Sequence, residues 1–419
     1  MSIAIEAERP PSYTPALTVL TSLFFVWGLL TSLNDILVPH LKAIFTLTYV
    51  QAMMIQFCFF GAYFVMSLPA GYLVEKVGYR LSIVIGLGAA ALGCLGFYPA
   101  AVAQSYPLFL AALFVLASGI TLLQVAANPC VASLGSEETA PSRLNLSQAF
   151  NSLGTTIGPL LGSALILTGR ATGAASTTQE IDTVKAPYLV LAIVLLVTAA
   201  AFSRFHIPAA ADGVEARGSS AREQGEDRAR PSSGSGLWQH RHLVLGAIAI
   251  FVYVGAEVSL GSVLVNFMAQ PDIGGLSERA AGSYLSLYWG GAMAGRFVGA
   301  GVLRKFDAGR VLAGCALGAV LLLLASMTLT STPAMVAALA VGLCNSIMFP
   351  TIFALAIAEL GPRTGEGSGL LCMAIVGGAL VPVIMGFVAD RMGLTQAFFV
   401  PLVCYLYIVH YGLRGHRLR

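Results

Sequence analysis

The chain has 419 residues, of which 57% are hydrophobic and only 10% are charged, and its mean hydropathy is +0.81. A soluble domain carries about 25% charged residues because its surface must be solvated. These values therefore exclude a water-soluble protein and predict an all-α protein embedded in a lipid bilayer. The formal net charge of +3 gives no support for binding to nucleic acid.

The N-terminal residues 1–15 are polar and include Glu6 and Glu8. The apolar run that follows is too long for the hydrophobic part of a signal peptide, so no cleavable signal is expected. We expect residues 1–15 to form a cytoplasmic tail and the run to stay in the membrane as a helix.

A membrane helix needs about 20 mostly apolar residues, and twelve such runs follow one another along the chain. The first six predicted helices cover 16–44, 50–74, 80–103, 107–134, 143–168 and 186–206. The second six cover 242–269, 279–303, 310–331, 333–359, 366–389 and 394–413. Between the two sets, a stretch rich in Ser, Gly and charge has too few apolar residues to fold, which predicts a flexible linker. The expected units are a bundle at 16–206, a cytoplasmic linker at 207–241, a bundle at 242–413 and a cytoplasmic tail at 414–419.

A repeated pattern links the two sets of helices. In the fourth and tenth helices, an amide side chain lies five residues before a proline. In the fifth and eleventh helices, a glycine lies five residues before a proline. The matched residues are Gln124 and Pro129 with Asn345 and Pro350, and Gly154 and Pro159 with Gly377 and Pro382. The loops after the second and eighth helices also match, "GYLVEKVGYRL" with "GVLRKFDAGRV". These matches predict two parallel, pseudo-symmetric six-helix bundles, as in major facilitator transporters.

The distribution of Lys and Arg predicts the orientation, because cytoplasmic loops carry more of them. With both termini inside, the inner loops and tail hold Lys76, Arg80, Arg143, Arg304, Lys305, Arg310, Arg363, Arg414, Arg417 and Arg419. The outer loops hold Lys42, Arg170, Lys185, Arg279 and Arg391. Both termini and the linker are therefore expected in the cytoplasm.

Two carboxylates lie inside predicted helices, Asp35 in the first and Glu257 in the seventh. A charge at bilayer depth costs a few kcal/mol, so each must face a cavity or a partner. The functional interpretation is a protonatable or ion-binding group in a central cavity. The alternatives are structural, since Asp35 could cap a helix break near Pro39 and a protonated Glu257 could make an interhelical hydrogen bond.

Amides form a polar stripe on the fourth and fifth helices. Gln124 lies four residues before Asn128, and Gln148 lies three before Asn151, so each pair shares one helical face. With Asn345 and the flat ring of Trp289, they suit a neutral polyhydroxylated ligand. The alternatives are amide links between packed helices and a Trp that only packs. An anionic substrate would need Arg or Lys in the membrane, where only Arg296 is a candidate, and its position favours a gate or loop anchor.

The loop after the second helix is expected to fix two helix ends. Gly71 and Gly78 permit close approach and turning, while Glu75 and Arg80, with Lys76 between them, can bridge charges or cap carbonyl groups. Such contacts could bias one state of a transport cycle. The alternative is a plain solvated turn.

The sequence lacks the common enzyme motifs: it has no P-loop, no G-x-S-x-G and no H-E-x-x-H. Its seven cysteines all lie in apolar segments without metal-ligand spacing and are expected to be packed thiols. We therefore expect a protein that is not an enzyme, has no cofactor and has no firm metal site.

Several stretches resemble one known family. "FFVWGLLTSLNDILVPHLK", "GITLLQVAANPCVASLG", "SRLNLSQAFNSLGTTIGPLLG" and "YVGAEVSLGS", with "LYWGGAMAGRFVGA", "GLCNSIMFPTIFALAI" and "GSGLLCMAIVGGALVP", are similar to the fucose–galactose–glucose symporters of the major facilitator superfamily. Within that family the resemblance is closest to the bacterial glucose/galactose transporters. It covers nearly the whole chain outside the N-terminal residues and the linker.

The resemblance implies a twelve-helix inner-membrane sugar:cation symporter that works by alternating access. In the fucose branch, acids on helices one and four are tied to proton coupling; Asp35 matches the first, but Gln124 stands at the second and cannot titrate. Gln148 and Asn151 match positions that contact sugar. The co-transported ion is thus left open between H⁺ through Asp35 alone and a scheme that also uses Glu257, with Na⁺ near Asp35 as one candidate.

The expected function is cation-driven uptake of glucose or galactose by a protein for which one chain suffices. The expected sugar contacts are Gln124, Asn128, Gln148, Asn151, Trp289 and Asn345. One alternative keeps the fold but changes the substrate to fucose, fructose, N-acetylglucosamine or a drug-like molecule exported by antiport. Another is a membrane sugar sensor that does not transport.

Overall fold

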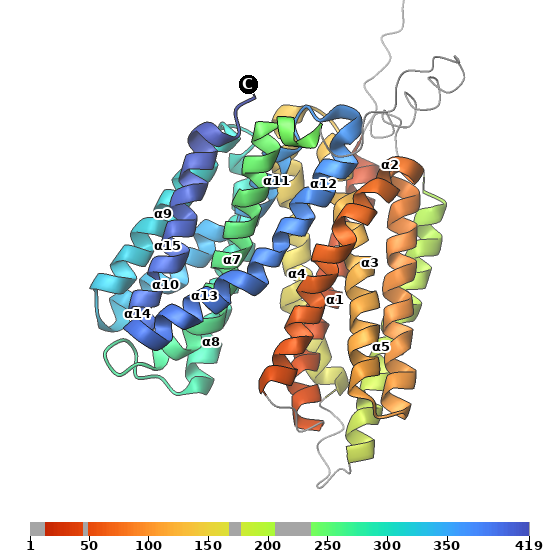
Figure 1. Ribbon diagram of the computed structural model, residues 1–419, viewed down its shortest axis with the longest axis horizontal. Coiled ribbons are helices and arrows are strands. Elements are labelled where there is room, and N and C mark those ends of the chain that lie inside the picture. Colours follow the sequence, from red (N-terminus) through yellow and green to blue (C-terminus); the bar gives the residue numbers. More distant parts are fainter. Residues whose placement is uncertain (1–12, 45–48, 167–176, 206–235, 419) are drawn as a thin grey trace, which may run out of the picture.

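The computed structural model describes residues 13–44, 49–166, 177–205 and 236–418, and within these ranges it leaves out the side chains at 33–53, 56, 159–187 and 278. The described chain consists of helices joined by short turns (Figure 1). Most of residues 1–15 and of the predicted linker lie outside the described residues, so the division of the chain into units stays a prediction.

The first half of the chain forms five long helices. They are α1 (Thr14–Ile44), α2 (Tyr49–Val102), α3 (Tyr106–Ser133), α4 (Ala140–Ile166) and α5 (Thr177–Ser203), with a short 3₁₀ turn at Glu137–Thr139. The 54-residue helix α2 includes two predicted membrane segments. They are separated at Gly78, whose φ of 81° interrupts the helix and requires glycine because a side chain is strained there.

The second half contains shorter and more often interrupted helices. They are α7 (Arg241–Ala269), α8 (Glu278–Val302), α9 (Ala308–Thr328), α10 (Ser331–Asn345), α11 (Met348–Ala356), α12 (Thr364–Met373), α13 (Gly377–Met392), α14 (Leu394–Ala397) and α15 (Phe399–His410). Short 3₁₀ turns lie at Leu237–Gln239, Gly361–Arg363 and Ala374–Val376, and a π-helical turn at Tyr411–Gly415 continues α15. The described part of each of the twelve predicted segments is mainly helical, which confirms the all-α prediction.

The described chain has the length and apolarity of a membrane protein. Eight of its helical stretches are long and apolar enough to cross a bilayer, and the stretch Phe57–Val102 is long enough to cross it twice. Large apolar side chains also remain outside the core, for example Leu92 at 65% and Val298 at 67% exposed. In water such a surface would aggregate, whereas in a bilayer it contacts lipid.

The repeat seen in the sequence has a structural counterpart. A side chain at Gly154 in α4 would collide with the carbonyl oxygen of Phe25 in α1, and one at Gly377 would collide with that of Phe251 in α7. In each half, therefore, a glycine of the fifth membrane segment lets the backbone approach the first segment closely. This matched pair is what a duplicated, pseudo-symmetric fold requires.

The two halves lie side by side and meet at one end of the molecule (Figure 1). We call it the C-terminal end, because the last described residues lie there. Helices α2, α3 and α4 of the first half contact α8, α11 and α12 of the second. The surface between the halves is where the predicted site residues were expected.

Candidate functional site

Three of the predicted amides meet inside the first half. Gln124 and Asn128 lie one turn apart on α3, Gln148 lies on α4, and all three side chains are buried. Gln148 Nε2 donates to Asn128 Oδ1 at 3.4 Å, and Gln124 Nε2 donates to the hydroxyl of Tyr63 at 2.5 Å. The Asn128 amide nitrogen has no partner among the described atoms. A buried N–H without an acceptor is costly, so this group is a donor suited to a polar ligand.

Asn151 has a different environment. Its Nδ2 donates to the backbone oxygen of Phe24 in α1 at 3.0 Å. One turn earlier on α4, the hydroxyl of Ser147 lies 3.2 Å from that of Thr21. This face of α4 therefore binds α1, and the Asn151 amide nitrogen makes an interhelical link of the kind that was the structural alternative.

In the second half, a buried polar network is centred on Asn345. This residue ends α10 and is fully buried. Its Nδ2 donates to the hydroxyl of Tyr288 in α8 at 2.8 Å, and its Oδ1 accepts from the hydroxyl of Tyr405 in α15 at 2.7 Å. Its backbone oxygen accepts from Tyr253 in α7 at 3.1 Å. One amide residue thus holds three helices through tyrosines that are themselves fully buried.

Glu257 lies at the edge of this network and is partly exposed. Its Oε1 lies 2.7 Å from the hydroxyl of Tyr253, which is on the same helix and whose single proton is shared between this oxygen and the Asn345 backbone oxygen. A carboxyl group at the edge of a buried polar network can bind a proton or a cation, which is what a coupling role needs.

Two prolines of the repeat release backbone carbonyl groups toward other helices. A proline has no N–H, so the carbonyl four residues earlier loses its helical partner. Before Pro129, the oxygen of Val125 accepts instead from Ser368 Oγ of α12 at 2.8 Å. Before Pro350, where α10 and α11 are separate helices rather than one, the oxygen of Ser346 accepts from Arg296 Nε at 3.1 Å.

Arg296 also joins the two halves. Its guanidinium group donates to the hydroxyl of Ser152 in α4, while its backbone oxygen accepts from Asn145 Nδ2 at 2.7 Å. Near the same contact, the rings of Phe150 and Phe297 meet edge to face with centroids 5.8 Å apart. The arginine is thus an anchor between the halves, whereas its position in the sequence had favoured a gate or a loop anchor.

The predicted loop residues Gly71 and Glu75 contact the other half at the C-terminal end. Glu75 Oε1 accepts from the backbone nitrogen of Glu366 at 2.9 Å, in the first turn of α12, where the helix dipole favours a negative charge. A Cβ at Gly71 would lie 2.8 Å from the carbonyl oxygen of Gly365. The side chain of Arg80, beyond the turn at Gly78, is exposed. The loop is therefore not a plain solvated turn, although its contact is to a backbone N–H rather than to a charge.

The structure shows fewer contacts for two of the predicted site residues, Trp289 and Asp35. Trp289 is 44% exposed, and its ring meets that of Tyr288 edge to face at 5.1 Å, next to the Asn345 network. The side chain of Asp35 lies outside the described residues. The described backbone of α1 continues through Pro39, so the helix break that Asp35 could have capped is not there.

Sequence reasoning missed the tyrosines of the site, which are Tyr63, Tyr253, Tyr288 and Tyr405. One signal was available, because Tyr253 lies four residues before Glu257 and shares its helical face. The others come from helices far apart in the sequence, and no local spacing brings them together.

Replacing Asn345 by alanine should lower the stability of the protein. The change leaves the buried hydroxyl of Tyr405 without its acceptor and opens a small cavity, so we expect a loss of about 2–4 kcal/mol. Thermal unfolding of the purified protein in detergent measures this. Tyr407→Phe is a control, because Tyr407 donates to a backbone oxygen outside the network; an equal loss in both variants would contradict the central role of Asn345.

Comparisons with known proteins bear on the family and the fold of this chain. Residues 19–375 match the Major Facilitator Superfamily. The chain is 53% identical to the glucose/galactose transporter of Brucella abortus over 98% of this chain and 97% of that protein. It is 35% identical to the L-fucose-proton symporter of Escherichia coli over 96% of this chain and 93% of that one. A crystal structure of the transporter FucP in the outward conformation superposes with a TM-score of 0.87 at 33% identity, covering 98% of this chain and 100% of that one.

Proposed function

The chain belongs to the major facilitator superfamily, and on this basis we propose that it takes up a neutral monosaccharide, glucose or galactose, by symport with a cation. The observation that carries the proposal is a pair of uncharged hydrogen-bonding clusters, one in each half: the Gln124–Asn128–Gln148 amides and the Asn345–tyrosine network. The similarity to a glucose/galactose transporter over nearly the whole chain supports the choice of sugar.

The proposed sugar site lies between the halves. On one side, Gln148 and the unpartnered Asn128 nitrogen offer hydrogen bonds to sugar hydroxyls. On the other, the partly exposed ring of Trp289 offers an apolar face beside the Asn345 network. Neutral donors and acceptors with an aromatic surface suit a polyhydroxylated ring, whereas a drug exporter needs a mainly apolar pocket. Gln124 completes the site, and Asn151 shapes it by holding α4 on α1.

Asp35 and Glu257 are the proposed coupling residues. A cavity that contains a free carboxylate resists closing, because the charge would lose its water, and a bound Na⁺ or proton neutralises that charge. Movement of the halves then depends on the ion. Glu257 supports this scheme because its carboxyl group is partly exposed at the edge of the Asn345 network and contacts the hydroxyl of Tyr253.

We also propose that the C-terminal end faces the cytoplasm and that the protein resides in the inner membrane. Most Lys and Arg residues of the short loops belong to this end, which the positive-inside rule assigns to the cytoplasm. The hydrogen bonds of Glu75 with Glu366 and of Ser142 with Ala300 close this end. In this orientation the structure corresponds to a state that receives sugar from outside. One chain holds both halves of the site, so a monomer suffices.

Substrate exchange tests the proposed sugar without depending on the ion. Proteoliposomes loaded with unlabelled glucose should take up labelled glucose or galactose far faster than protein-free liposomes, and unlabelled fucose should compete weakly. Faster exchange with fucose, fructose or N-acetylglucosamine would contradict the choice of sugar. Saturable binding of glucose without any exchange would instead support a sensor.

Replacing Gln148 by alanine should weaken sugar binding without uncoupling transport. A lost hydrogen bond to a neutral ligand costs about 1–2 kcal/mol, so we expect the KM for exchange to rise about tenfold. The accumulation ratio at saturating sugar should be unchanged, because Gln148 does not titrate. Thr198→Ala is a control, since Thr198 donates to the oxygen of Val194 within its own helix. An unchanged KM in the Gln148 variant would remove this residue from the proposed site.

A further inference from the structure

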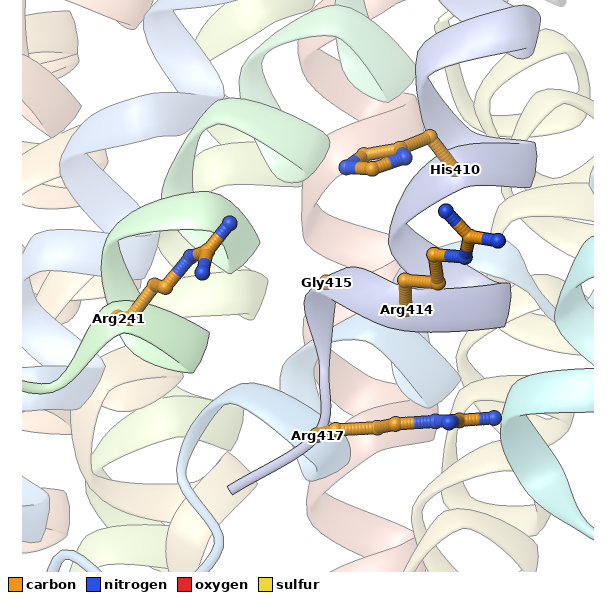
Figure 2. A pocket seen from close by; sticks show the side chains of 5 residues that line it. All are labelled: Arg241, His410, Arg414, Gly415 and Arg417. Carbon is orange, nitrogen blue, oxygen red and sulfur yellow. The ribbon is translucent and has the colours of Figure 1, made fainter. Parts of the chain in front are cut away.

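A cationic cavity opens at the C-terminal end, away from the surface between the halves. Its volume is about 180 Å³, and it is lined by Arg241, His410, Arg414, Gly415 and Arg417. Arg241 of α7 and His410 of α15 point toward each other across it, and the two other arginines flank it on the turn that ends the chain (Figure 2). Of the residues that the structure shows lining it, none is acidic.

Most of the lining residues lie at the end of α15 or just after it. Along this part of the chain, exposed apolar side chains give way to cationic ones. Val403 and Leu406, both 47% exposed, are followed four residues after Leu406 by His410, which ends α15. Residues three or four apart share a helical face. Arg414 lies in the π-helical turn that follows, and Arg417 lies just after that turn, so both extend the cationic surface beyond the end of α15. A surface suited to acyl chains therefore runs directly into a cationic one.

Helix α7 also has a cationic side chain at this end and an exposed apolar side chain further along. Arg241, at its first position, lies two turns before Ile248, which is 43% exposed. The two neighbouring helices thus place cations at the same end and exposed apolar side chains further into the membrane. An amphiphile with an anionic head and apolar tails complements this arrangement, whereas a free anion uses only the head part.

We propose that this cavity binds the phosphate headgroup of an anionic phospholipid, whose acyl chains lie along the exposed faces of α7 and α15. Basic pockets between membrane helices bind such headgroups, and each arginine near the surface contributes about 1 kcal/mol. Guanidinium groups suit the site because they bind phosphate oxygens in a bidentate manner. A bound lipid would hold α7 and α15 together, and the proposal needs only that this end of the molecule lies at a membrane surface.

Positive charge at this end could instead reflect membrane orientation alone. Arg304 and Lys305 at the same end provide the comparison, because both are exposed but neither lines the cavity. A double variant Arg304→Gln/Lys305→Gln changes the net charge by the same amount as Arg241→Gln/Arg414→Gln. Only the second pair removes the proposed phosphate contacts.

Native mass spectrometry of the full chain in a neutral detergent tests the proposal with phosphatidylglycerol as the probe. We expect phosphatidylglycerol to bind at least about tenfold more tightly than phosphatidylcholine. Each removed arginine should weaken its binding about fivefold, so the Arg241→Gln/Arg414→Gln variant should lose about 25-fold. The Arg304→Gln/Lys305→Gln variant should bind like the unchanged protein.

Three results would overturn the proposal. The first is equal binding of the two lipids, and the second is an equal loss of binding in both double variants. The third is displacement of the lipid by inorganic phosphate at matching concentrations, which would identify a free anion as the occupant. If the cavity variant does not fold, a salt titration of the unchanged protein decides. Retention of phosphatidylglycerol should then fall as ionic strength rises while that of phosphatidylcholine does not, and equal salt dependence would refute the site.

Discussion

Replacing Gly369 by leucine is expected to lower uptake strongly by disfavouring closure of the C-terminal end. A Cβ at this position of α12 would lie 2.7 Å from the carbonyl oxygen of Ser67 in α2, so a larger side chain must push the two halves apart. Overpacking of this kind costs about 1–3 kcal/mol. A cost of about 2 kcal/mol lowers the ratio of closed to open molecules about thirtyfold, and uptake should fall by up to a similar factor.

The matched control is Gly386→Leu. Gly386 lies on α13, in the same membrane segment, and nothing lies within 4 Å of a Cβ there, so uptake should be retained. Spin labels at the exposed positions Tyr72 and Phe306, in a cysteine-free background, report the separation of the halves. The Gly369 variant should show longer distances than the control. Unchanged distances with lost uptake would contradict the account of this contact.

Replacing Asp35 by asparagine is expected to abolish uphill accumulation while leaving sugar exchange within a few-fold of normal. Asparagine keeps the size of the side chain but cannot bind a proton or contribute a charge to a Na⁺ site. The free energy of closing the cavity then no longer depends on the ion, and coupling is lost. Accumulation and exchange, measured in the same proteoliposomes, separate the two effects. An equal loss of both would contradict a coupling role.

Glu257→Gln is the companion variant, because its amide oxygen can still accept from Tyr253 and the network around Asn345 is retained. If Asp35 alone couples protons, this variant keeps accumulation. If both carboxylates hold the ion, it loses accumulation as Asp35→Asn does. The fold is unchanged in either case, so loss of exchange as well would show that Glu257 is structural.

The fold was largely predictable from sequence because membrane helices follow from local composition. Each predicted apolar run falls on a helix, and the Gly154 and Gly377 pair correctly indicated a duplication. It was less predictable which predicted segments join into one helix and which are split into two. The predicted second and third segments lie in one helix, α2 (Tyr49–Val102), with an interruption at Gly78, because they share a short turn that remains helical. The tenth segment is split where Pro350 releases the carbonyl of Ser346.

The site was only partly predictable, since its partners come from distant segments. The amides of α3 and α4 were identified by their spacing within single helices, and the structure brings Gln148 to Asn128. The tyrosines around Asn345 could not be found in this way, because Tyr288 and Tyr405 lie 57 and 60 residues from it. The same holds for Glu75, whose partner is a backbone N–H 291 residues away.

The central claim is that sugar moves against its gradient at the expense of an ion gradient. The most direct test is uptake of labelled glucose into proteoliposomes on which a proton gradient and a Na⁺ gradient are imposed separately. We expect accumulation above equilibrium under one of the two gradients, which identifies the ion. Exchange without accumulation under either gradient would contradict symport and leave facilitated diffusion, with Asp35 in a structural role.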